Sequence, residues 1–461
     1  MDLHIVITRP ILVLVFFLLC IGIAVLPGNS RAASIGLIRD AEIENNIRLY
    51  STPVFRAAGL DPGSVNIYIV NDNSLNAFVA GGQNLFLNTG LIMRSDSASQ
   101  IIGVIAHETG HISGGHLSRI RDAMSKSSIP SILSFVLGGA ATLATGRADV
   151  GAAIIAGGSN ASMRNFLSYT RDQEASADQA ALKLLDSTNQ SSQGFLEFMR
   201  ILEDQELLST ASQDPYVRSH PLSSDRIITI ANHVAKSRYS SKPDSPEFVT
   251  MHARMKAKLT AFISSPGATL RRYKPADTSL DARYARAIAH YRSADLDKAF
   301  AELDPLISEH PNDPYFIELK GQILYENGKI LESLPFYEQA SQLLPESAII
   351  RKELASVQLG LEKPELLEPA IRNLRYAISK EPKASGTWRQ LAIAYGRSGD
   401  KCNSSLALAE EALLIDKPEI AIYHAGLAER LFKEGTREWL QAQDIQIAAK
   451  DLEKRLKEKD K

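Results

Sequence analysis

The sequence predicts an α+β domain, mainly helical with a small antiparallel sheet, followed by an all-α solenoid. Three observations support this fold class. Short apolar segments rich in β-branched residues lie between residues 65 and 87, and turn residues separate them. A segment with helical periodicity and two histidines four residues apart follows at 97–111. From about residue 281, small and aromatic residues recur with a 34-residue period, which is typical of stacked helix pairs.

The N-terminal segment has the pattern of a signal peptide. Arg9 precedes an apolar run from Ile11 to Leu26, and Ser30-Arg31-Ala32 offers small residues for cleavage after residue 32. An uncleaved membrane anchor is the alternative, because the run is close to the shortest length that spans a bilayer. Both interpretations predict export.

Composition limits the classes of function. The chain has 461 residues, 44% of them hydrophobic, which is enough for two or three domains with their own cores. Its formal net charge of -2 gives no indication of nucleic-acid binding. Of the two cysteines, Cys20 lies in the predicted signal peptide, so Cys402 has no internal disulfide partner in the mature chain.

The first domain is predicted to begin with a helix over residues 37–58, which ends at the turn Leu60-Asp61-Pro62-Gly63. Three short strands follow, at residues 65–70, 77–80 and 84–87. They form the small sheet beside the next helix. The edge strand of such a sheet could bind an extended peptide through main-chain hydrogen bonds.

The pentapeptide HETGH occupies residues 107–111 of a helix whose expected N-cap is Ser97. On a helix, His107 and His111 project from one face, so both imidazoles can bind one zinc ion. Glu108 would then lie beside the open coordination position of the metal, where it could act as a general base. Because the pattern also occurs by chance, an ordinary helix with polar residues on one side is the alternative.

A catalytic zinc site needs a third protein ligand and keeps its fourth position for water. The helical segment at 169–178 is the best candidate to supply it, because Glu174 and Asp178 lie one turn apart on one of its faces. Neighbouring alanines favour burial, and a buried carboxylate requires a partner such as a metal. A solvated acidic face is the alternative. Asp178 could orient a ligand imidazole or assist the leaving group, whereas His116 and His290 are expected to be ordinary packing or surface histidines.

Further motifs surround these residues. They are HETGH at 107–111, YTRDQEASAD at 169–178, Ser219-His220-Pro221, Arg226-Ile227, Asn76-Ala77-Phe78 and Asn88-Thr89-Gly90-Leu91. Together they cover about residues 40 to 235 and resemble the M48 family of zinc metallopeptidases. The combination is far more specific than HETGH alone.

The resemblance implies a zincin-like zinc metalloendopeptidase that binds one Zn2+ per subunit. The family's metal ligands match His107, His111 and Glu174, its general base matches Glu108, and its helper acid matches Asp178. His220 matches a family histidine that approaches the metal and regulates access to it. Without the resemblance, the simpler interpretation of His220 is a surface histidine in a turn.

Residues 129–158, between the HETGH helix and Glu174, form an apolar insertion rich in Gly and Ala. A polar stretch at 145–149 divides it, and neither half is long enough to span a bilayer comfortably. A helical hairpin packed over the active site is the first interpretation. A lid or plug that makes peripheral contact with a membrane or an apolar client is the second.

The C-terminal half is repetitive. Ala287, Gly321 and Ala355 recur at 34-residue spacing, and the same phase returns after a three-residue slip at Lys363-Pro364-Glu365. This is the tetratricopeptide period, in which small residues lie where paired helices touch. Such arrays stack into a concave superhelix that binds other proteins.

The predicted organisation is a signal peptide, a metallopeptidase domain, a linker, a repeat domain and a charged C-terminal tail. Their predicted residues are 1–32, 33–265, 266–280, 281–445 and 446–461. This order resembles periplasmic M48 members, which implies a periplasmic protein that degrades misfolded envelope proteins, supports outer-membrane protein assembly in a chaperone-like way, and contacts the assembly machinery through its repeats. The alternatives are a membrane-anchored protein facing the periplasm, and a repeat-based chaperone or scaffold with latent protease activity.

Overall fold

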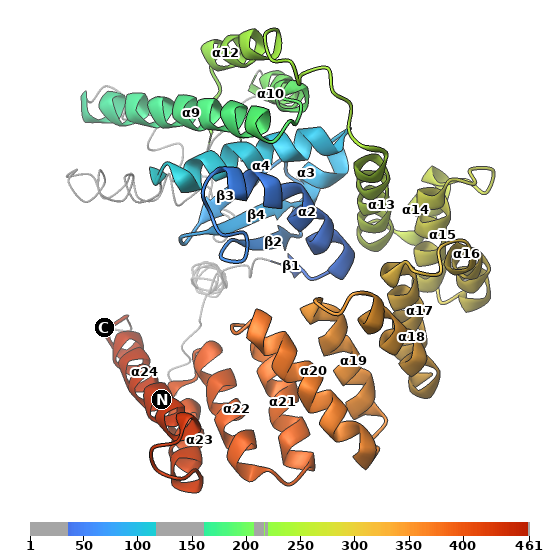
Figure 1. The fold of residues 1–461 in the computed structure, drawn as a ribbon, viewed down its shortest axis with the longest axis vertical. Coiled ribbons are helices and arrows are strands. Elements are labelled where there is room, and N and C mark those ends of the chain that lie inside the picture. The colour runs from blue at the N-terminus through green and yellow to red at the C-terminus, as the bar shows by residue number, and fades with distance from the viewer. Residues whose placement is uncertain (1–35, 117–160, 207–215, 217–219, 460–461) are drawn as a thin grey trace, which may run out of the picture.

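The structure is a computed structural model that describes residues 36–116, 161–206, 216 and 220–459 (Figure 1). The predicted signal peptide and the insertion at 129–158 lie outside these residues. Within the described ranges, none of the helices combines the length and the apolar character that crossing a bilayer needs. The chain forms an α+β part followed by an arc of helices, as the sequence predicts (Figure 1).

The α+β part contains four strands and six helices among the described residues. They are β1 (Leu37–Ile38), α2 (Ala41–Ala57), β2 (Asn66–Val70), β3 (Ala77–Ala80), β4 (Asn84–Asn88), α3 (Thr89–Arg94), α4 (Ala98–Ser113), α9 (Ala161–Ser187), α10 (Gln193–Glu206) and α12 (Ser224–Val234). The predicted first helix begins later than expected, because the side chain of Asp40 caps it at the N–H of Ile43 and the preceding residues pair with β2. Ser97 caps α4 as predicted, accepting from the N–H of Gln100 at 3.4 Å.

The sheet is mixed, and the prediction of an antiparallel sheet was therefore wrong in part. The strand order is β1-β2-β4-β3, with β2 parallel to β4 and the other two pairs antiparallel. Residues 71–76 carry the chain past the end of β4, where the Gly90 N–H donates to Asp72 O and the Asn88 N–H donates to Asn76 O. This crossing places β3 beyond β4 instead of beside β2. Gly81 and Gly82, with φ of +57° and +100°, then turn the chain into the β3–β4 hairpin.

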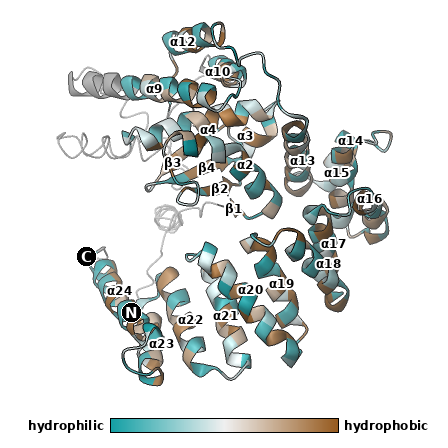
Figure 2. Ribbon diagram, in the orientation of Figure 1, coloured by the Kyte–Doolittle hydropathy of each residue, from teal (hydrophilic) through white to brown (hydrophobic). Residues whose placement is uncertain are grey.

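Helix α4 lies in the middle of the α+β core. All of its residues from 100 to 111 are buried, and α2, α3, α9 and α10 surround it together with the sheet (Figure 1). Gly103 permits this packing, because a Cβ there would lie 2.6 Å from Cβ of Phe195 on α10. Most surrounding helices carry both hydrophobic and hydrophilic residues, as helices on a core do (Figure 2). The two histidines therefore sit on a rigid, fully packed helix.

The C-terminal part is a helical array. Its described elements are α13 (Pro246–Ile263), α14 (Pro266–Arg272), α15 (Leu280–Arg292), α16 (Leu296–Glu309), α17 (Pro314–Glu326), α18 (Ile330–Leu343), α19 (Ala348–Gly360), η1 (Pro364–Leu366), α20 (Leu367–Lys380), α21 (Ser385–Arg397), α22 (Lys401–Leu414), α23 (Pro418–Leu431) and α24 (Arg437–Lys459). Helices α15, α17 and α19 begin at residues 280, 314 and 348, so the 34-residue period is confirmed. The three-residue slip becomes the 3-10 turn η1.

Small residues do lie where paired helices touch. A Cβ on Gly321 of α17 would be 3.0 Å from Cδ2 of Tyr337 on α18, so the two helices approach closely at this point. The predicted linker at 266–280 contains α14, and the predicted tail beyond residue 445 continues α24 to residue 459. Ala449 is buried against the preceding pair. The tail was not predicted to be part of a packed helix, because most of its residues are charged and few are apolar.

A cluster of buried charges joins the α+β part to the array. Glu42 of α2 is 1% exposed; its carboxylate lies 2.7 Å from Arg254 Nε and 3.3 Å from Lys258 Nζ, both on α13. Tyr284 of α15 donates to the same carboxylate at 3.0 Å, and Arg254 also pairs with Asp313 before α17. One acidic side chain of the first helix is thus neutralised by residues far along the chain.

Candidate metal centre

Helices α4 and α9 approach each other at Gly110, the fourth residue of the HETGH pentapeptide. A Cβ on Gly110 would lie 2.8 Å from the carbonyl oxygen of Ala177 and 3.2 Å from Cβ of Ala180. The lack of a side chain therefore lets α9 lie directly against α4. This contact brings Glu174 and Asp178 to the histidine face of α4.

Four predicted residues meet at this contact. His107, His111, Glu174 and His220 each place a possible ligand atom within 4.8 Å of the others, and all four are buried. Nε2 of His107 lies 3.1 Å from Nε2 of His111 and 3.3 Å from Nδ1 of His220, and that Nδ1 lies 3.1 Å from a carboxylate oxygen of Glu174. Three imidazoles and one carboxylate converging on one point form a donor set that fits a metal ion.

Glu108 lies beside this cluster and is fully buried. Nε2 of His220 lies 3.5 Å from its Oε1. Neither carboxylate oxygen has a hydrogen-bond partner among the described residues. Burial raises the pKa of the Glu108 carboxyl. Such an unsatisfied buried carboxylate is costly for folding, which is expected where the group acts on a bound molecule.

Asp178 lies behind the cluster. Its Oδ1 is 2.9 Å from Nδ1 of His107, the ring nitrogen that points away from the other ligand atoms. Arg226 donates to both oxygens of Asp178, at 2.6 and 2.9 Å, and its Nη1 lies 3.2 Å from Glu174. This contact fits the first of the two roles that the sequence left open for Asp178, orientation of a ligand imidazole. Arg226 belongs to one of the motifs that resemble the M48 family, but the sequence predicted no role for it.

His220 is held in place by its own neighbourhood. The His220 ring stacks on the Tyr216 ring, with centroids 4.4 Å apart. The backbone N–H of His220 donates to the backbone carbonyl oxygen of Tyr216 at 2.7 Å. Arg226 donates to the carbonyl oxygen of Pro221 at 2.9 Å, which fixes the following residue. Nothing in the sequence distinguishes Tyr216 from other aromatic residues, so its part in the site could not be predicted.

Two of the cluster residues, His111 and Glu174, have the charge states that metal binding needs. Burial would lower the pKa of His107, but the contacts with Asp178 and Glu174 outweigh it and raise the pKa to about 9. Burial lowers the pKa of His111 well below its usual value. Burial raises the pKa of the Glu174 carboxyl, but the nearby His220 and His111 outweigh burial and hold that pKa well below its usual range. A neutral His111 and an ionised Glu174 are the forms that bind metal.

His116, expected to be an ordinary packing or surface histidine, is buried and also contacts a candidate metal ligand. His116 is 2% exposed, and its Nδ1 lies 3.0 Å from Nδ1 of His111. The reason is the chain reversal after α4, which folds the ring back onto the helix end. His290 lies on α15, outside the cluster.

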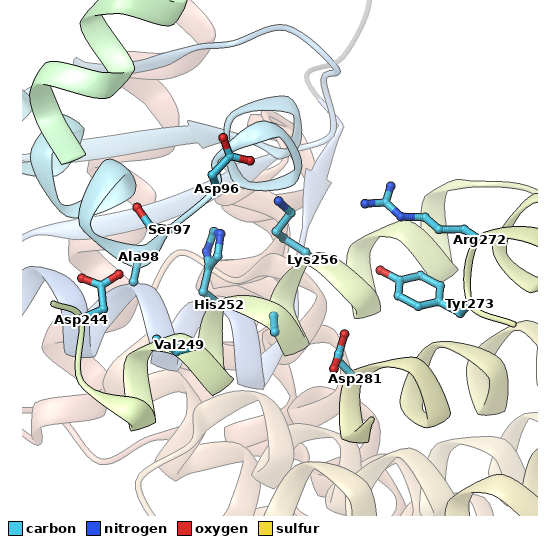
Figure 3. A pocket seen from close by; sticks show the side chains of 11 residues that line it. Asp96, Ser97, Ala98, Asp244, Val249, His252, Lys256, Arg272, Tyr273 and Asp281 are labelled. Atoms are coloured by element: carbon cyan, nitrogen blue, oxygen red, sulfur yellow. The ribbon is translucent and has the colours of Figure 1, made fainter. Parts of the chain in front are cut away.

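A separate cavity of about 340 Å³ lies where the start of α4 faces α13 and α14 (Figure 3). Lys256 and His252 line it and both contact the carbonyl oxygen of Ser95, while Arg272 and Asp281 face it from the array side. Its lining carries charges of both signs. The cavity is a polar junction between the two parts of the molecule and contains none of the cluster residues.

Comparison with known proteins identifies the α+β part. Residues 39–234 match peptidase family M48. The chain carries an M48 peptidase domain. With the buried His/Glu cluster, this domain makes the chain a metallopeptidase.

Two curated relatives match most of the chain. The chain is 23% identical over 394 residues to the beta-barrel assembly-enhancing protease of Yersinia pestis, covering 85% of this chain and 80% of that protein. It is 24% identical over 380 residues to the protein of the same name from Escherichia coli (strain K12), with 80% and 75% covered. Among solved structures, MamA is 18% identical over 37% of this chain and 96% of its own, with a TM-score of 0.28.

Proposed function

We propose that this metallopeptidase is a zinc-dependent endopeptidase of the periplasm that degrades misfolded outer-membrane proteins and supports their assembly. The observation that carries the proposal is the buried set of His107, His111 and Glu174 with Glu108 beside it. The names of the relatives support the substrate class. The pattern of residues 1–32 supports export through a signal peptide.

In this proposal His107, His111 and Glu174 hold the metal. Two imidazoles and a carboxylate are the ligands that catalytic zinc commonly takes. When bound, Zn2+ would supply a Lewis acid that polarises the scissile carbonyl and makes water a better nucleophile at neutral pH. Glu108 accepts the proton of the attacking water and passes it to the leaving amine, because neither of its carboxylate oxygens has a hydrogen-bond partner among the described residues.

Asp178 and Arg226 act on the ligands in this proposal. Asp178 accepts from Nδ1–H of His107 and so leaves Nε2 of that ring free to bind the metal. Arg226 fixes Asp178 by a two-point contact and therefore supports the orientation of the imidazole. Because both oxygens of Asp178 are used in this way, the proton-donor role is the less favoured of the two.

His220 supports a second candidate function, a chaperone or scaffold with latent protease activity. Its Nδ1 lies near both His107 and Glu174, where a fourth ligand would bind. A metal with four protein ligands lacks the open position that hydrolysis requires. In this state the repeats would hold clients or the assembly machinery, and displacement of His220 would start cleavage. The insertion at 129–158 is proposed to contact the membrane or an apolar client.

The experiment combines metal analysis with degradation of an unfolded β-barrel protein. We expect about one Zn2+ per chain by mass spectrometry of the purified protein, and cleavage that stops on chelation and returns with Zn2+. The same β-barrel protein, folded in detergent, is the control and should resist cleavage. Undiminished cleavage after the metal is removed would contradict the proposal. Suppression of aggregation without cleavage would favour the second function.

A further inference from the structure

Helix α4 ends in a sequence that reverses the chain at once. Gly115 has a φ of +63°, and its N–H donates to Ile112 O at 3.0 Å. At Gly114 a Cβ would lie 2.5 Å from Nε2 of His116. The two glycines therefore provide the space and the backbone freedom that the His116 ring needs to fold back against the helix.

The folded-back ring meets the outer side of a candidate ligand. Nδ1 of His116 lies 3.0 Å from Nδ1 of His111, and the two rings are nearly perpendicular, at 82°. The other nitrogen of His111, Nε2, points into the cluster: it lies 3.1 Å from Nε2 of His107 and 3.4 Å from Glu174. His111 thus has one nitrogen toward the cluster and one toward His116.

The protons of this pair follow from the chemistry of imidazole. A neutral ring carries one N–H, and the nitrogen that binds a metal cannot carry it. If Nε2 of His111 binds the metal, its proton is on Nδ1, and that N–H donates to Nδ1 of His116. His116 must then accept at Nδ1 and carry its own proton on Nε2.

We infer that His116 is a positioning residue that fixes the tautomer and the ring orientation of His111 for metal binding. The inference rests on the metal site of the proposed function. It gives the two histidines of HETGH different supports: Asp178, a carboxylate, for His107, and His116, a neutral imidazole, for His111. Substitution of a residue that hydrogen-bonds to a metal ligand commonly lowers the metal affinity.

Three substitutions in the full chain test the inference. In His116→Asn, the amide oxygen occupies nearly the same place as Nδ1 and can accept the hydrogen bond. In His116→Gln, the amide group reaches the place of Nε2 instead, and His116→Leu has no acceptor. We expect Zn2+ affinity, measured by competition with a chelator, to fall about 10- to 100-fold in the Leu and Gln variants and to stay near the wild-type value in the Asn variant.

The absorption bands of the Co2+-loaded proteins give a second readout, and they should change in the Leu variant but not in the Asn variant. His290→Leu, outside the cluster, is the control for loss of a histidine. This inference, but not the proposed function, would be overturned if His116→Leu bound Zn2+ as tightly as the wild type. It would also be overturned if His116→Asn bound Zn2+ as weakly as His116→Leu. A wild-type protein that binds no Zn2+ would overturn the proposed function and this inference with it. Thermal melting curves of all variants would test whether each one is folded.

Discussion

His107 and Glu108 are adjacent in the chain, yet their side chains have opposite surroundings. The outer nitrogen of His107 lies 2.9 Å from a carboxylate that is itself held by an arginine. The oxygens of Glu108 have no hydrogen-bond partner among the described residues. A side chain that supports a metal needs fixed contacts, whereas a general base needs oxygens that are free to accept a proton.

Replacing Glu108 tests this division of roles. Glu108→Gln should keep Zn2+, because the ligands are untouched, and should lower the cleavage rate by about 100-fold or more, because an amide cannot accept the proton. His107→Ala should lose the metal as well. Metal content and degradation of an unfolded substrate measure both effects. Cleavage by Glu108→Gln at the wild-type rate would show that the base is another residue.

His220 should restrain the enzyme. In His220→Ala the fourth position near His107 and Glu174 becomes accessible, so we expect faster degradation of unfolded substrates. His233→Ala, on the neighbouring helix α12 and outside the cluster, is the matched control. If activity and Zn2+ affinity of His220→Ala equal those of the wild type, His220 has no regulatory role.

At this scale, spacing within one helix could be predicted and contacts between distant segments could not. Two histidines four residues apart must share a helix face, and Glu174 and Asp178 follow the same rule. The contacts of His116, Tyr216 and Arg226 depend on chain reversals and loops, whose course no local pattern specifies. The His116 turn had a signal, two glycines after the helix, but glycines commonly end helices without any further role.

At the scale of elements, the site depends on how closely α9 lies against α4. Gly110→Ala should push the helices apart, because the new Cβ meets the backbone oxygen of Ala177 at 2.8 Å. We expect a loss of about 1–3 kcal/mol in the free energy of unfolding and weaker Zn2+ binding, since Glu174 moves with α9. Chemical unfolding and chelator competition measure the two effects.

Gly426→Ala is the control for this substitution. Gly426 lies inside α23, where a Cβ would meet nothing within 4 Å, so alanine should stabilise the protein by up to about 1 kcal/mol. Equal effects of the two substitutions would mean that the contact at Gly110 is not tight.

The elements themselves follow from periodicity and capping. The strand at 77–80 and the cap at Ser97 lie where the sequence predicts them. The parallel pairing of β2 and β4 could not be predicted, because strand order depends on where residues 71–76 cross, and alternation of side chains is the same in parallel and antiparallel strands.

At the scale of the whole molecule, the repeats are attached by buried charges. Glu42→Leu removes the carboxylate that Arg254 and Lys258 share. Arg254 keeps Asp313 and Lys258 keeps Asp40, so the loss should be at the low end for a broken buried ion pair, roughly 3 kcal/mol. Lys298→Ala, which breaks an exposed pair with Asp295, should change stability by less than about 1 kcal/mol. Unfolding followed by circular dichroism measures both. Equal small effects would show that the junction contributes little to stability.

The same junction sets an order of events when the chain is made. Glu42 is synthesised early, but Arg254, Lys258 and Tyr284 follow only after the entire M48 domain. Until they arrive, α2 carries a carboxylate that cannot be buried without its cations, and α2 packs directly on α4. Helix α4 is therefore fully supported only after α13 has been made and α15 has supplied Tyr284. A chain that ends before α13 should therefore pack α4 poorly, although it contains every residue of the candidate metal centre.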